Sequence, residues 1–119
     1  MPELTFKDNV TVCFSVNNQA ILEKAKRVFF QLGYDCHVTG GLEGNHSQKS
    51  FHYRNAALDF GVKHIPADQR ETVKKALCGE FGCRYPGGIG PNYDVLHEAQ
   101  GTDNEHIHIE EDVKARRGL

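Results

Sequence analysis

Apolar and polar residues alternate early in the chain and then recur at helical spacing. Residues 9–16 alternate with the period of a half-buried strand, with one apolar side formed by Val10, Val12, Phe14 and Val16. The next apolar residues repeat every three or four positions and predict a helix, namely Ile21, Leu22, Ala25, Val28, Phe29 and Leu32. We expect Asn17 or Asn18 to cap this helix and Gly33 to end it.

The remaining pattern predicts four more strands and a second helix. The strands are expected at 34–39, 56–62, 93–97 and 106–110. The helix is expected at 67–78, after Pro66 and before Gly79, with an inner side of Val73, Ala76 and Leu77. The segment 40–50 is polar with three glycines, and 79–91 holds five glycines and two prolines, so both are expected to be irregular.

These elements fit a single α+β domain. A chain of 119 residues with 39% hydrophobic and 25% charged residues has enough apolar side chains for one core. We therefore expect residues 1–119 to form one domain, with a charged tail at about 111–119. Its two helices are expected to pack on a small, mainly antiparallel sheet, with Phe29, Phe30 and Phe60 in the core.

Charge and hydropathy exclude several partners. Lys and Arg number 14 against 16 Asp and Glu, so no basic stripe is available for a nucleic-acid backbone. Apolar runs stay well below the ~18 residues of a membrane span. The first residues lack the basic and apolar regions of a signal peptide, so we expect synthesis in the cytoplasm, no membrane association and a monomer.

The four cysteines are scattered at positions 13, 36, 78 and 83. Cys78 and Cys83 form C-x4-C, which is compatible with half of a structural zinc site or with a local disulfide, but no second pair follows. We expect ordinary reduced thiols.

Histidines supply the candidate chemistry, since the chain contains seven of them. His106 and His108 would project from the same face of a strand, and His52 precedes Asp59 by seven residues. Imidazole and carboxylate are suitable zinc ligands, and two His with one Asp would leave a coordination position for water. H-x-H alone is weak evidence, because alternate histidines on a strand are more often solvated.

A family resemblance strengthens this interpretation. The run Ser50-x-His52-x-x-Asn55-x-Ala57-x-Asp59, followed by His106-x-His108, resembles the signatures of the zinc D-Ala-D-Ala carboxypeptidase and Hedgehog-domain superfamily, the M15 type of metallopeptidase. The resemblance extends in order over about residues 17–110 and is closest to small phage or bacterial peptidoglycan peptidases. It implies a fold like that of Hedgehog domains and D-Ala-D-Ala peptidases.

The resemblance also implies roles for individual residues. His52, Asp59 and His108 would bind one zinc ion, and His106 would donate a hydrogen bond to the oxyanion. The catalytic base would be Glu98 or Glu105; Glu98 is preferred because the strand before it matches the family better. Candidate substrate-binding residues are His46, Ser50 and Arg54. No calcium is expected, because only Glu43 remains of the acidic loop that binds calcium in Hedgehog domains.

The implied function is a zinc metallopeptidase that hydrolyses an amide bond in peptidoglycan stem peptides. Cleavage as a D-Ala-D-Ala carboxypeptidase and as an L-Ala-D-Glu type endopeptidase both remain open. The small size is similar to that of phage endolysins, which reach the cell wall after lysis or from a virion. The alternative is a catalytically inert, Hedgehog-like, zinc-containing binding module. A retained glutamate argues for the enzyme, whereas the absence of the family's substrate-binding arginine after Thr39 argues for the module.

Overall fold

The structure, a computed structural model, describes residues 1–10, 16–41 and 57–111. Within these ranges the chain forms one five-stranded sheet with the order β1-β2-β3-β5-β4. Strands β1 and β2 are parallel, and every other neighbouring pair is antiparallel. The strands are β1 Leu4–Phe6, β2 Cys36–Gly40, β3 Ala57–Gly61, β4 Tyr93–Glu98 and β5 His106–Glu111.

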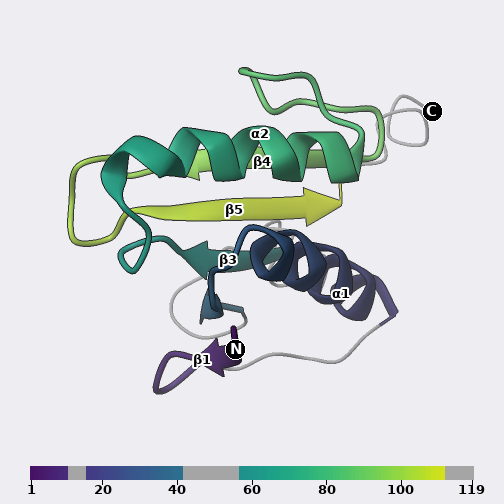
Figure 1. Cartoon of the computed structure of the whole chain (residues 1–119). Helices are drawn as coiled ribbons and strands as arrows, with labels where there is room; N and C mark the ends of the chain where they lie inside the picture. The colour runs from purple at the N-terminus through teal and green to yellow at the C-terminus, as the bar shows by residue number, and fades with distance from the viewer. Residues whose placement is uncertain (11–15, 42–56, 112–119) are drawn as a thin grey trace.

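Two helices cover one face of this sheet (Figure 1). They are α1, Val16–Gln31, and α2, Arg70–Phe81; a 3-10 turn at Ala67–Gln69 precedes α2. Helix α1 packs over β2 and β3, and α2 packs over β4. The predicted α+β class, with two helices on a mainly antiparallel sheet, is confirmed. No helix in the described ranges is both long enough and apolar enough to cross a membrane.

The core lies between the helices and the sheet. Alternate residues of β3 and β5 face the helices and are fully buried, namely Leu58, Phe60, Ile107 and Ile109. Phe29 of α1 stacks on Phe60 with ring centroids 5.9 Å apart, and Phe30 packs at the edge of the same core. Burial of each such side chain stabilises the fold by about 1.5–3 kcal/mol, which fixes the register of both strands.

The predicted strand at residues 9–16 is wrong in its described part. Asn9 has φ 69° and lies in a turn in which the Val10 N–H donates to the Lys7 carbonyl at 3.3 Å. The chain therefore leaves the sheet after β1, a short edge strand that the pattern did not predict. Helix α1 already begins at Val16, so Asn17 and Asn18 lie inside it rather than at its cap. Residues 11–15 lie outside the described residues.

The helix ends show which glycine predictions hold. Gly33 ends α1 as predicted: it has φ 87°, and the N–H groups of Gly33 and Tyr34 donate to the carbonyls of Phe30 and Phe29. The predicted end of α2 at Gly79 is wrong, because the helix continues to Gly82, with φ 73°. Phe81, beyond Gly79, is buried and its ring lies 5.1 Å from that of Tyr93. This burial outweighs the ~1 kcal/mol cost of a glycine inside a helix.

The described cysteines are free thiols. Cys36 and Cys78 are buried, and Cys83 is partly buried. Burial raises the pKa of the Cys36 thiol to about 12, so this group stays protonated in neutral solution. Cys13 lies outside the described residues.

Candidate functional site

The face of the sheet opposite the helices carries the predicted chemistry. Asp59 of β3 and His108 of β5 are directly opposite each other in the antiparallel register. Their side chains meet with 2.7 Å between Asp59 Oδ1 and His108 Nδ1, although 49 residues separate them in sequence. The sheet therefore brings together two of the three ligands that the sequence predicted.

A second carboxylate, which the sequence analysis did not identify, holds the other side of His108. Glu110 Oε1 lies 2.8 Å from His108 Nε2. Burial lowers the pKa of His108, but the hydrogen bonds and charges of Asp59 and Glu110 outweigh it and raise the pKa to about 10. A carboxylate behind a ligating imidazole fixes the ring of that ligand and increases its basicity. The sequence pattern that could have identified Glu110 is its alternation with His106 and His108 along β5, which places all three side chains on one face.

His106 occupies the same face and faces two carboxylates. Its Nδ1–H donates to the Asn104 carbonyl at 2.6 Å, which turns Nε2 toward Glu98 Oε1 at 3.0 Å. The same Nε2 lies 3.9 Å from Asp59 Oδ1. A hydrogen bond between Nε2 and the Glu98 carboxylate needs one proton on either group, so the pair can hold and pass a proton.

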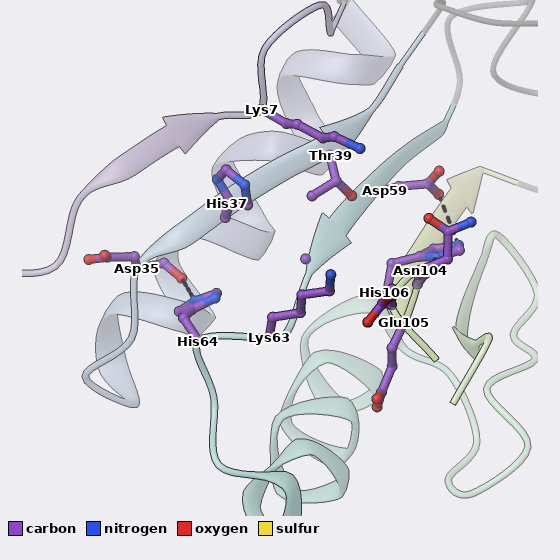
Figure 2. Close-up of a pocket in the computed structure, with 12 residues that line it drawn as sticks. Lys7, Asp35, His37, Thr39, Asp59, Lys63, His64, Asn104, Glu105 and His106 are labelled. Atoms are coloured by element: carbon purple, nitrogen blue, oxygen red, sulfur yellow. Dashed lines mark hydrogen bonds and ion pairs between the residues drawn. The ribbon is translucent and has the colours of Figure 1, made fainter. Parts of the chain in front are cut away.

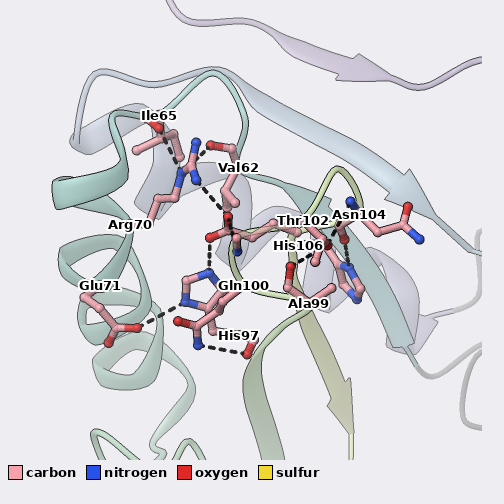
Figure 3. A network of polar contacts seen from close by, with 12 residues as sticks. Val62, Ile65, Arg70, Glu71, His97, Ala99, Gln100, Thr102, Asn104 and His106 are labelled. Atoms are coloured by element: carbon pink, nitrogen blue, oxygen red, sulfur yellow. Dashed lines mark hydrogen bonds and ion pairs between the residues drawn. The ribbon is translucent and has the colours of Figure 1, made fainter.

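The carboxylate of Glu105 lies between Arg70 of α2 and His97 of β4, two residues that Figure 3 labels, rather than among Asp59, His106 and His108. Its carboxylate accepts hydrogen bonds from Arg70 Nη1 at 2.8 Å, His97 Nε2 at 2.6 Å and the Gly101 N–H at 3.2 Å. Burial raises the pKa of Glu105, but these hydrogen bonds and the charge of Arg70 outweigh it, so the pKa lies below its ordinary value. The geometry thus separates the two candidate bases: Glu98 faces His106, and Glu105 faces α2.

The network around Glu105 holds the connection between β4 and β5. Arg70 Nε also donates to the carbonyls of Val62 and Ile65, at 3.0 and 2.9 Å, which ties this connection to the segment after β3. His97 bridges Glu105 and Glu71 of α2, with Nδ1 3.1 Å from Glu71 Oε1. The two strands pair up to this connection, and Glu98 and His106 form their last cross-strand pair.

Gly40 of β2 leaves space for the Asp59 carboxylate. A Cβ atom on Gly40 would lie 2.5 Å from Asp59 Oδ2, well inside contact distance. The register between β2 and β3 also shifts between Val38 and Gly40, where Gly40 becomes the partner of Asp59. Gly40 is therefore a positioning residue for the carboxylate, a role that required the three-dimensional structure to recognise.

A cavity of about 600 Å³ adjoins the cluster, with Asp59 and His106 on one side of it (Figure 2). Its volume lies within the range of ligand-binding pockets. The opposite side is formed by β2 and by the segment after β3, with His37 and Lys63 among the lining residues. Glu105 also lines this cavity, whereas Glu98 and His108 are not among its described lining residues. The space beside Asp59 and His106 is large enough for a short peptide.

The donor chemistry suits zinc as far as the structure describes it. Asp59 and His108 supply a carboxylate and an imidazole, both preferred zinc ligands, and Glu110 supports the imidazole. The third predicted ligand, His52, and the candidate substrate residues His46, Ser50 and Arg54 lie outside the described residues. Among the residues that are described, no three His, Cys, Asp or Glu side chains have the arrangement of a metal site.

Comparisons of the chain with protein-family models, with curated proteins and with solved structures find no significant match.

Proposed function

We propose that this protein is a zinc peptidase that hydrolyses an amide bond in peptidoglycan stem peptides, reaching the wall after lysis or from a virion. One observation carries the proposal: Asp59 and His108, distant in sequence, meet on the face of the sheet opposite the helices, beside the Glu98–His106 pair. This placement agrees with the ligand and catalytic roles that the family resemblance implies. The adjoining cavity supplies room for a peptide.

The donor types of Asp59 and His108 suit one zinc ion. Asp59 and His108 would hold it together with His52, and Glu110 would hold the His108 ring in place. When bound, zinc lowers the pKa of a coordinated water to about 7 and so supplies a nucleophile in neutral solution.

The protein's own groups would manage the protons of the reaction. Glu98 takes the proton from the attacking water and passes it to the leaving amine. His106, with its Nδ1–H held by the Asn104 carbonyl, would donate to the oxyanion from Nε2 when the proton that it shares with Glu98 lies on Nε2, which also leaves the Glu98 carboxylate ionised as the base. Glu98 is the better base of the two candidates, because the Glu105 carboxylate is already engaged by Arg70 and His97.

The deciding experiment combines zinc analysis with hydrolysis of purified cell wall. We expect about one zinc per chain in the parent and release of stem-peptide fragments. Glu98→Gln is expected to keep the zinc and to lower kcat by about 10²–10⁴-fold, the usual contribution of a general base. Glu105→Gln is expected to retain most of the activity at neutral pH. Glu23→Gln, at an exposed position on α1, is the matched surface control.

The same experiment identifies the alternative. A parent protein that holds zinc but releases no fragment from any wall preparation is the inert, Hedgehog-like binding module. A parent protein that holds no zinc contradicts both functions. If Glu98→Gln cleaves as fast as the parent, Glu98 is not the base.

A further inference from the structure

The cavity has a second end, away from Asp59, that carries positive charge. Lys7 follows β1 and Lys63 follows β3, and both line the cavity. Their side chains extend from separate segments toward the space beside Thr39 (Figure 2). Two ammonium groups from distant parts of the sequence therefore face one space.

Neither ammonium group is paired with a carboxylate in the part of the chain that the structure describes, residues 1–10, 16–41 and 57–111. Asp35 also lines the cavity, and its carboxylate accepts a hydrogen bond from the Glu3 N–H at 2.8 Å. His64 Nε2 donates to the Asp35 carbonyl at 2.7 Å, so His64 is also engaged. At this end Lys7 and Lys63 supply two positive charges and Asp35 supplies one negative charge, so positive charge is in excess.

The charge of Lys7 acts on His37, which also lines the cavity. His37 lies on the floor of the cavity, with its ring held by a 2.7 Å hydrogen bond between Nδ1 and Thr5 Oγ1. Burial, His64 and Lys7 lower the pKa of His37, in that order of size, while Asp35 raises it. In its neutral form His37 can form a hydrogen bond with a ligand and leaves the charge at this end of the cavity unchanged.

Gly61 lines the cavity between its two ends and adds no side chain to the wall there. A Cβ atom at Gly61 would lie 2.8 Å from Thr39 Cγ2 and 3.1 Å from His37 Cδ2. The floor therefore runs without a side chain at Gly61 from the candidate zinc ligand Asp59 toward His37. An extended ligand can contact both ends at once.

We propose that Lys7 and Lys63 bind a free carboxylate of the substrate while its amide lies at Asp59 and His106. This inference rests on the proposed function and specifies its substrate: a stem peptide cut close to a residue with a free carboxylate. Lysine ammonium groups bind carboxylates through charge-assisted hydrogen bonds, which are stronger than neutral ones. The carboxylate comes either from the C-terminal D-Ala or from a D-Glu whose α-carboxylate is free.

The test uses synthetic stem peptides that contain L-Ala-D-Glu and end in D-Ala-D-Ala. Each peptide is compared with two amidated versions, one at the C-terminus and one at the D-Glu carboxylate. In the parent, amidation of the recognised carboxylate is expected to lower kcat/KM by about 10-fold or more. The amidated position that causes the loss identifies the source of the carboxylate.

Substitution of the lysines shows whether they are responsible. Lys7→Met and Lys63→Met keep the length of the side chain and remove its charge. Each is expected to reduce the preference for the carboxylate peptide over its amide by about 3-fold, through KM rather than kcat, and the double variant is expected to abolish it. Lys75→Met, at an exposed position of α2, is the matched control. A double variant that keeps the preference of the parent overturns the proposal.

A binding measurement separates this inference from the proposed function. Equilibrium binding of the peptides to Glu98→Gln needs no hydrolysis, and Lys7→Met with Lys63→Met is tested in the same background. Binding that favours the carboxylate peptide, weakens with salt and disappears in this variant supports the site even if the parent hydrolyses nothing. Equal binding of carboxylate and amide peptides overturns the site even if the parent is a peptidase.

Discussion

The two faces of strands β3 and β5 differ in composition, although each strand contributes alternate side chains to both faces. One face is apolar and lies under the helices, with Leu58, Phe60, Ile107 and Ile109 fully buried. The other face carries Asp59, His106 and His108, which remain partly accessible to solvent. Because side chains alternate along a strand, the packing of the apolar face fixes which residues appear on the other face.

This comparison shows how stability and chemistry are divided. The apolar face holds the register that places Asp59 opposite His108. A shift of the β5 register by one residue would place the histidines in the core and the isoleucines on the face with the cavity. The burial of the isoleucines therefore disfavours a register in which the histidines leave that face. The face opposite the helices can then carry charged and polar groups, and we expect their replacement to affect the proposed function more than folding.

The largest effect on folding is expected at the apolar face. Phe60→Ala removes a fully buried ring that stacks on Phe29, so the free energy of unfolding should fall by about 3–5 kcal/mol. Urea unfolding followed by circular dichroism measures this change. Leu32→Ala, at an exposed position, should lower it far less. Similar losses in both variants would contradict the position of the core.

The face opposite the helices is expected to show the reverse balance. His108→Gln removes a candidate zinc ligand, so zinc affinity should fall by more than ~100-fold, because loss of a group that merely supports a ligand costs 10–100-fold. The unfolding free energy of the zinc-free protein should fall by less than in Phe60→Ala, because His108 contributes hydrogen bonds rather than apolar burial. Competition with a zinc indicator and urea unfolding measure the two quantities. Unchanged zinc affinity would remove His108 from the site.

Gly40 tests how closely the neighbouring strand shapes the site. Gly40→Ala places a methyl group against the Asp59 carboxylate, so zinc affinity should fall and the unfolding free energy should fall by about 1–3 kcal/mol. The matched control is Gly79→Ala, because a Cβ there meets no atom within 4 Å and Gly79 lies inside α2. That control should stabilise the protein by roughly 0.5–1 kcal/mol. Equal zinc affinity in both variants would show that the Asp59 carboxylate has room to move.

The sequence predicted the parts of this molecule that depend on local patterns. Helical spacing located α1, the left-handed glycine located its end, and alternation located β3, β4 and β5. The start of α1 and β1 were missed because Val10 and Val16 fit the period of a strand equally well. Gly79 was mistaken for a helix end because the burial of Phe81, a tertiary effect, is not visible in the local pattern.

The candidate site was predicted in its residue types and only partly in its geometry. The resemblance named Asp59, His106 and His108, and the structure places them together. It left Glu98 and Glu105 open, since the choice depends on which side chains contact each carboxylate. The roles of Gly40 and Glu110 follow from contacts between side chains and backbone across strands, which spacing along one chain does not show.

The smallest effect is expected from the Glu105 carboxylate, and it depends on pH. The pKa of Glu105 is lowered in the folded protein, so its contribution to stability is fully present above its ordinary pKa of 4.5 and is lost as the pH falls through the folded value. Glu105→Gln should therefore be less stable than the parent at pH 7, and its stability should fall less on acidification below about pH 4.5. Urea unfolding at a series of pH values measures this difference, with Glu23→Gln as the exposed control. Parallel acid profiles for Glu105→Gln and the parent would mean that Arg70 and His97 do not stabilise the ionised carboxylate.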